Sequence, residues 1–289
     1  MNKLIIVVLV LLLPASLLTA QQTSPPAPQA QPAGKRPPQA KTQQEYKDYN
    51  TAYALTGGAV VEKAANDFAE KYPQSELRSY LYSKAMHDYQ TENNPGKMLA
   101  MGEKVLALDP DNSIALVLTA TVLADSLSDA DQDRDQKIGE IKKNSNRALE
   151  TVDSGFVPPP GATAEQIDAY KKTLQSMAHS ALGIMELKTA DDTSAEKDLR
   201  SAADLNKTQP DPYIWYHLAL AQDHLATATV DKEQQQKKYV EALASVNQAL
   251  QYTGSNADLG RLAQGERERL QKLASLSTPV TGGTNKPPQ

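Results

Sequence analysis

One helical pattern recurs along the chain and constrains the fold more than any other feature. The clearest copy consists of Trp215, Leu218 and Ala219, followed by Ala242, Val246 and Ala249. An earlier copy consists of Leu182 and Gly183, followed by Ala195, Leu199 and Ala202. Apolar residues three and four apart lie on one face of an α-helix. Recurrence of such helix pairs at intervals of a few tens of residues predicts an array of stacked hairpins.

Proline divides the chain between these helices. Pro73, Pro110 and Pro210 each follow a helical segment, and proline ends helices because it lacks a backbone donor and clashes with the preceding turn. No run of alternating apolar and polar residues bounded by turns predicts a strand. The expected fold class is therefore all-α, with small residues allowing close helix contact and large residues filling the opposite holes. The small residues are Ala85, Gly183, Ala195, Ala202, Ala219, Ala242 and Ala249, and the large ones are Tyr82, Leu199, Trp215 and Val246.

The recurring helix pairs resemble the tetratricopeptide repeat (TPR) family, whose unit is a helix pair of about 34 residues. Residues 79–112 fit that length without a gap, and their matching positions are Tyr82, Ala85, Tyr89, Met98, Gly102, Val105 and Pro110. Residues 176–210 and those from 212 onward fit with insertions, and 42–75 and 113–155 are weaker units. The resemblance implies an α-solenoid of about four to five helix hairpins that holds a partner on its concave face.

Several segments depart from a regular array. Residues 125–136 and 226–238 lengthen two of the pairs, and we expect extended helices and protruding loops there. A long helix is expected from Thr163 to Leu187, opened by a capping pattern. The last expected helix, about 256–273, has a polar outer face that suits a C-terminal cap closing the solenoid.

The two ends are predicted to lie outside the folded domain. Residues 1–20 have the basic start, the apolar run and the small final residue of a signal peptide. Residues 21–44 are rich in proline and glutamine and read as a disordered linker. Residues 276–289 read as a disordered tail, which leaves 45–275 for the solenoid. The expected location is periplasmic or secreted, with the inner membrane as the alternative if the signal is an uncleaved anchor.

Composition excludes several classes of function. The chain has no cysteine, so disulfides, thiolate metal sites and a lipid-modified signal are excluded. The net charge of −5 argues against a nucleic-acid partner, which a clustered basic face usually binds. Hydrolase and zinc-protease motifs and a glycine-rich phosphate loop are absent from the sequence. We therefore expect a non-enzymatic protein without a cofactor.

The first helix of each hairpin supplies the candidate binding surface. The candidates for peptide or partner binding are Tyr80, Ser83, His87, Ser180, Ile184, Tyr213, Tyr216 and Leu220. None is Lys or Asn, so the carboxylate grip of some TPR relatives is not indicated. Tyrosine and apolar residues instead suit a helix or an extended peptide, although apolar residues at helical spacing, such as Ile184 and Leu220, more often pack against a neighbouring helix. The expected function is an exported scaffold or adaptor for protein–protein interaction.

An acidic insertion gives an alternative. Acids at alternate positions followed by a glutamate have the spacing of an EF-hand calcium loop. They are Asp129, Asp131, Asp133, Asp135 and Glu140. Arg134 stands where that loop requires glycine, which favours a solvated loop over a calcium-responsive module. A subunit of an envelope enzyme complex is a third hypothesis, and a deep pocket with convergent polar groups would favour it.

Overall fold

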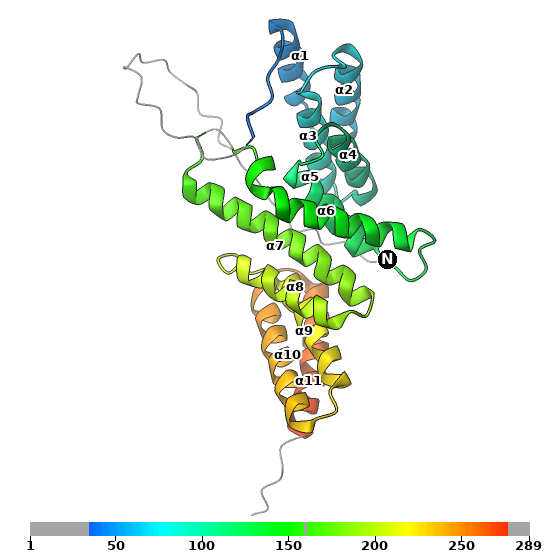
Figure 1. Ribbon diagram of the computed structural model, residues 1–289, viewed down its shortest axis with the longest axis vertical. Helices are drawn as coiled ribbons and strands as arrows, with labels where there is room; N and C mark the ends of the chain where they lie inside the picture. Colours follow the sequence, from blue (N-terminus) through cyan, green and yellow to red (C-terminus); the bar gives the residue numbers. More distant parts are fainter. Residues whose placement is uncertain (1–34, 159–160, 277–289) are drawn as a thin grey trace, which may run out of the picture. The chain divides into compact units, whose positions relative to one another are not determined.

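The computed structural model describes residues 35–158 and 161–276, and within these ranges every regular element is an α-helix (Figure 1). The described chain forms two compact units. Unit 1 contains residues 35–126 and 139–174, and unit 2 contains 127–138 and 175–276. The predicted signal peptide, the linker up to residue 34 and the tail from 277 lie outside the described residues.

Eleven helices make up the described chain. Unit 1 holds α1 (Gln43–Tyr53), α2 (Gly58–Lys71), α3 (Arg78–Thr91), α4 (Pro95–Leu108) and α5 (Ser113–Ser126). Unit 2 holds α8 (Asp192–Leu205), α9 (Pro212–Ala228), α10 (Lys232–Tyr252) and α11 (Ala257–Leu276). Two helices, α6 (Arg134–Gly155) and α7 (Ala164–Lys188), contribute residues to both units.

Unit 1 is a stack of successive helix pairs, in which each helix packs against the next. Glycines mark places where neighbouring helices approach each other closely. A Cβ atom at Gly102 of α4 would lie 2.4 Å from Cγ2 of Thr119 on α5, and one at Gly58 of α2 would lie 2.3 Å from the Tyr89 ring on α3. Short capped turns connect the helices, such as the turn between α3 and α4, where Asn94 accepts a hydrogen bond from the Lys97 amide. Helix α5 is apolar nearly all round and lies in the core of this unit.

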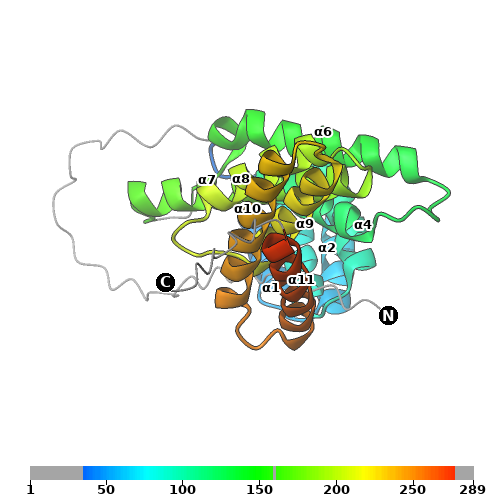
Figure 2. The ribbon, with the colours of Figure 1, turned by 90° about the horizontal axis from the view of Figure 1, so that it is seen from below.

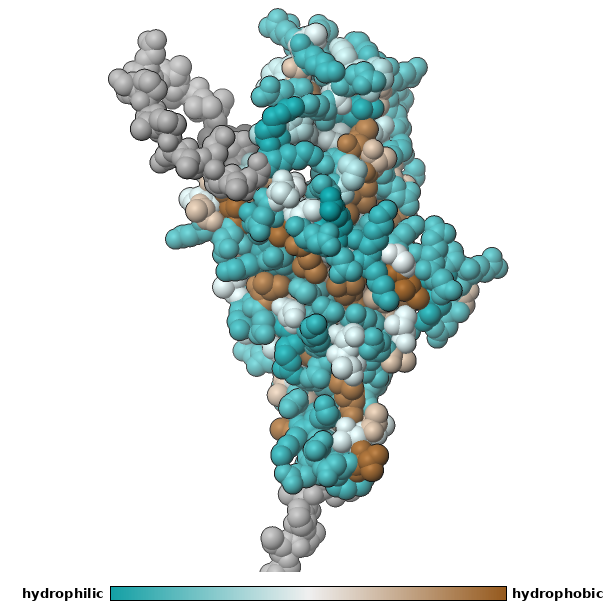
Figure 3. Space-filling model, viewed as in Figure 1, coloured by the Kyte–Doolittle hydropathy of each residue, from teal (hydrophilic) through white to brown (hydrophobic). Residues whose placement is uncertain are grey.

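Unit 2 repeats the same packing. Helix α8 packs on α9, α9 on α10 and α10 on α11, which Figure 2 shows side by side. A core cluster runs through the last three helices, and Trp215 and Tyr216 pack against its edge. Gly183 brings α7 against α8, since a Cβ atom there would lie 2.6 Å from Cγ of Leu199. On the face drawn in Figure 3, polar residues cover most of the surface and apolar residues appear between them in patches.

The all-α prediction is confirmed, and so is its packing logic. In the described chain, five helix pairs are followed by a final helix, α11, in the place of the expected cap. The six small alanines named from the sequence are fully buried, and Leu199 and Val246 are buried opposite them. The insertion at 226–238 is mostly helical, because α9 runs to Ala228 and α10 begins at Lys232. The insertion at 125–136 contains a seven-residue connection between α5 and α6.

Candidate binding surfaces

Helix α3 keeps the predicted binding residues at the surface of unit 1. Tyr80 and Ser83 are half-buried, and the His87 side chain is 50% exposed. Leu81 and Ala85, on the opposite side of the helix, are fully buried. These three candidates therefore lie away from the side of α3 that is turned into the stack.

Helix α9 likewise keeps its predicted binding residues at the surface of unit 2. Tyr213, Tyr216 and Leu220 are half-buried, whereas the intervening Leu218 and Ala219 are fully buried. The helix begins at Pro212, and the Asp211 side chain caps it by accepting a hydrogen bond from the Tyr213 amide at 2.8 Å. Burial raises the pKa of that carboxyl, and the backbone amides of the first turn oppose the rise.

An aromatic cluster surrounds His217 on the same helix. Its Nδ1 lies 2.8 Å from the carbonyl oxygen of Tyr213, so Nδ1 carries the proton and donates. The rings of Tyr213 and Tyr216 contact the imidazole edge-on, with centroids 4.2 and 5.4 Å away. The pKa of His217 is lowered to about 4, first by burial and also by the positive charge of Lys188, while its hydrogen bond to Tyr213 opposes the shift. The ring is therefore neutral at physiological pH and acts as an aromatic packing group.

The two predicted binding residues on α7 differ in exposure. Ser180 is half-buried and reaches the surface. Ile184 is 2% exposed, which corrects its placement on a binding wall: the side chain is part of the protein interior. Residues 181–185 are all buried, so this stretch of α7 has no outward face for periodicity to identify.

The acidic insertion pairs with its own basic residues. Lys137 lies 3.0 Å from Asp131 and 3.1 Å from Asp133, and Arg134 lies 3.2 Å from Asp129. The pKa of Asp131 is lowered, first by its hydrogen bond with Lys137. No group of three or more acids or histidines in the described part of the chain is arranged to hold a metal ion. This arrangement gives the calcium hypothesis no support.

A groove that the sequence did not indicate lies on unit 1. Its volume is about 600 Å³, and it opens between the start of α1, the start of α3 and the chain segment that precedes α1. Its lining consists of residues 37–43 together with Tyr46, Tyr49, Leu77 and Tyr80. We call it the tyrosine groove. Tyr80 is the one predicted binding residue that it contains.

The tyrosines of the groove differ in exposure. Tyr46 is 57% exposed, whereas Tyr49 and Tyr80 are half-buried. The pKa of Tyr49 is raised, first by burial and then by the neighbouring tyrosines 53, 80 and 46, which places the four side chains in one cluster. Burial and the charge of Asp109 raise the pKa of Tyr80. The raised pKa values keep the hydroxyls of Tyr49 and Tyr80 protonated at neutral pH, so each can donate a hydrogen bond to a ligand carbonyl.

Comparisons with known proteins add no name to these surfaces. No protein-family model matches the sequence, and a search of curated proteins returns no match. None of the helices in the described ranges combines the length and the hydropathy of a membrane span. The resemblance to the TPR family rests on the residue pattern alone.

Proposed function

We propose that this protein is an exported, non-enzymatic scaffold that binds a protein or peptide on the first helices of its hairpins. One observation carries the proposal. Seven of the eight residues named from the sequence for this role remain partly or largely accessible, although they stand on helices whose other faces are buried. Partly exposed tyrosine combines a large apolar ring with a polar tip and is favoured at interfaces.

The TPR-like pattern supports the same proposal. Arrays of stacked helix pairs present extended surfaces that bind other proteins. The signal-like residues 1–20 place the expected partner in the cell envelope or outside the cell. The surfaces on α3 and α9 belong to different units, and each is proposed as a contact surface in its own right.

Site-specific photo-crosslinking tests the proposal. A photoreactive amino acid replaces Ser83 or His87 on α3, or Leu220 on α9, and the purified full chain is exposed to its own envelope fraction before irradiation. Matched controls carry the same group at Lys63 on α2 and Gln251 on α10, two exposed positions on second helices. The expected result is a discrete crosslinked protein from the first-helix positions only. Equal products from all positions, or none from α3 and α9, refute the proposed surface.

A further inference from the structure

The segment before α1 is held against unit 1 although its composition predicts an unpacked linker. Residues 35–42, here called the strap, form neither helix nor strand. The amide of Lys35 donates to the carbonyl oxygen of Phe156 at 3.1 Å, and the Lys41 amide donates to Oε2 of Glu45 at 2.7 Å. These two bonds fix both ends of the strap on unit 1.

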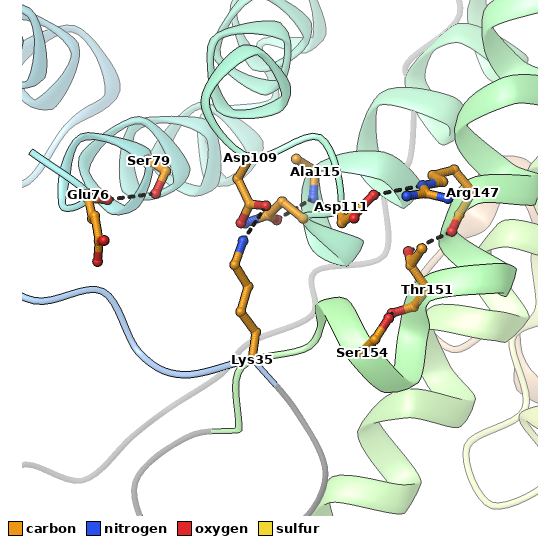
Figure 4. A network of polar contacts seen from close by, with 10 residues as sticks. Lys35, Glu76, Ser79, Asp109, Asp111, Ala115, Arg147, Thr151 and Ser154 are labelled. Carbon is orange, nitrogen blue, oxygen red and sulfur yellow. Dashed lines mark hydrogen bonds and ion pairs between the residues drawn. The ribbon is translucent and has the colours of Figure 1, made fainter. Parts of the chain in front are cut away.

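Charge complementarity sets the position of the strap between those ends. The Arg36 guanidinium forms two hydrogen bonds with the Glu76 carboxylate, at 2.7 and 2.9 Å. The Lys35 ammonium lies 2.6 Å from Oδ1 of Asp109, and Figure 4 draws the two side chains facing each other. The pKa of Glu76 is lowered, first by its hydrogen bonds with Arg36. Two acids, one just before α3 and one just after α4, therefore form an anionic pair, here called the rim, that receives two consecutive basic residues.

Two prolines follow the basic pair and line the tyrosine groove. Pro37 and Pro38 share the groove with Tyr46, Tyr49 and Tyr80. Proline-rich segments dock on aromatic-lined grooves because their extended conformation is preformed, so little ordering entropy is lost on binding. The strap thus contains, in order, two basic side chains that pair with the acids of the rim and two proline rings that line the groove beside the tyrosines.

One of the two ion pairs of the strap is weak, and the strap leaves space beside it. The Arg36 and Glu76 side chains are 65% and 44% exposed, and ion pairs between exposed groups contribute little to stability because water and salt screen them. The groove retains about 600 Å³ beside the strap, within the range of about 300–1,000 Å³ of ordinary ligand pockets. A segment of the same chemistry can therefore displace the strap.

We propose that the tyrosine groove binds an extended, basic, diproline-containing segment of a partner protein, and that the strap is an internal copy of that ligand. The inference deepens the proposed scaffold function and rests on it for its biological meaning. When the strap occupies the groove, it competes with the partner segment. The affinity of the free groove is then reduced by the fraction of molecules in which the groove is open.

Fluorescence anisotropy with a labelled synthetic peptide of residues 35–42 tests the proposal on the purified full chain. The double change Lys35→Glu and Arg36→Glu releases the strap by inverting both of its charges. If the strap fills the groove in nine molecules of ten, the released variant should bind the peptide about tenfold more tightly than the unchanged protein. Equal affinity of the two proteins overturns the internal-copy inference.

Groove variants in the released background test the location. Tyr46→Ala should weaken peptide binding at least several-fold, and Tyr80→Ala should do the same. Tyr46 is largely exposed, so its replacement preserves the fold, which circular dichroism checks. The matched control is Tyr252→Ala, a tyrosine of unit 2 that is 39% exposed and should leave binding unchanged. Unchanged binding in the Tyr46→Ala variant refutes the groove.

Altered peptides and light scattering test the ligand chemistry and its source. A peptide with two glutamates in place of the basic pair should not bind, and one with two glycines in place of the prolines should bind several-fold more weakly. Equal binding of the diglycine peptide refutes the role of proline. A dimer of the unchanged protein that disappears in the released variant would assign the groove to the strap of a second copy and overturn the partner. Peptide binding is measured without a natural partner, so failure here leaves the crosslinking result on α9 standing.

Discussion

Replacing Gly183 by alanine measures how closely α7 and α8 approach each other. The new Cβ atom would lie 2.6 Å from Cγ of Leu199 and 3.1 Å from its backbone nitrogen, and Leu199 is fully buried. Overpacking of this kind costs about 1–3 kcal/mol, and a contact with the backbone places the cost near the upper end. Alanine in a helix gains about 1 kcal/mol over glycine, so we expect a net loss of roughly 2 kcal/mol.

Gly265 of α11 is the matched control in the same unit. No atom lies within 4 Å of a Cβ built there, so Gly265→Ala should show the propensity gain alone, about 0.5–1 kcal/mol. Urea unfolding followed by circular dichroism measures both variants. The two changes should move the midpoint of the unit 2 transition in opposite directions without changing its slope. If Gly183→Ala stabilises the protein as Gly265→Ala does, the close packing of α7 on α8 is refuted, and with it the role given to small residues in the repeat.

Three further predictions concern single side chains. The pKa of His217 is about 4, below the ordinary value of 6.5. The free energy of unfolding should therefore fall by roughly 3 kcal/mol between pH 6.5 and pH 4, because over this range the unfolded state takes up the proton more readily than the folded state. Urea titrations at several pH values should show that His217→Gln removes this part of the pH dependence. Leu218 is fully buried, so Leu218→Ala should cost about 2–5 kcal/mol through lost burial and a cavity, measured by urea unfolding. Asn94 caps α4, so Asn94→Ala should cost about 1 kcal/mol, and thermal unfolding that leaves the midpoint unchanged would refute the cap.

Much of the fold could be predicted because its causes are local. Pro73 follows the end of α2 at Lys71, and the expected long helix 163–187 is α7 at Ala164–Lys188. Glycine and alanine at fixed spacing predict close helix contacts, because the position of a small residue on a helix face depends only on the helix period. The positions of the helices and of their buried faces can therefore be predicted from residues that are close together in the sequence.

The binding surfaces could be predicted only in part. The spacing of Tyr46, Tyr49 and Tyr53 predicts one helical face, and these residues do lie on α1. However, Tyr46 and Tyr53 are 57% and 46% exposed, and Tyr46 and Tyr49 line the groove, so the shared face does not pack wholly into the core. Ile184 shows the opposite outcome, since it is buried where an outward face was expected. Periodicity identifies a face of a helix, and tertiary packing decides what covers it.

The docking of the strap on unit 1 could not be predicted from the sequence, for a different reason. A proline- and glutamine-rich segment cannot form a core of its own, and that inference says nothing about docking on a core formed elsewhere. The acids that receive it lie far along the chain, since Glu76 is 40 residues from Arg36 and Asp109 is 74 residues from Lys35. Only the folding of α3 and α4 brings both acids within reach of adjacent basic residues.

A salt series distinguishes an internal ligand from a bystander segment. Salt weakens the attraction of the rim acids for the peptide and for the strap alike, because both contain the same basic pair. While the strap occupies most grooves, the apparent affinity of the unchanged protein is the ratio of these two binding strengths, so it should change little with salt. The released variant, Lys35→Glu with Arg36→Glu, has no competing strap, so its affinity for the peptide should fall steadily over the same series. Parallel salt slopes in the two proteins would show that residues 35–42 do not compete for the site, whatever the peptide itself binds.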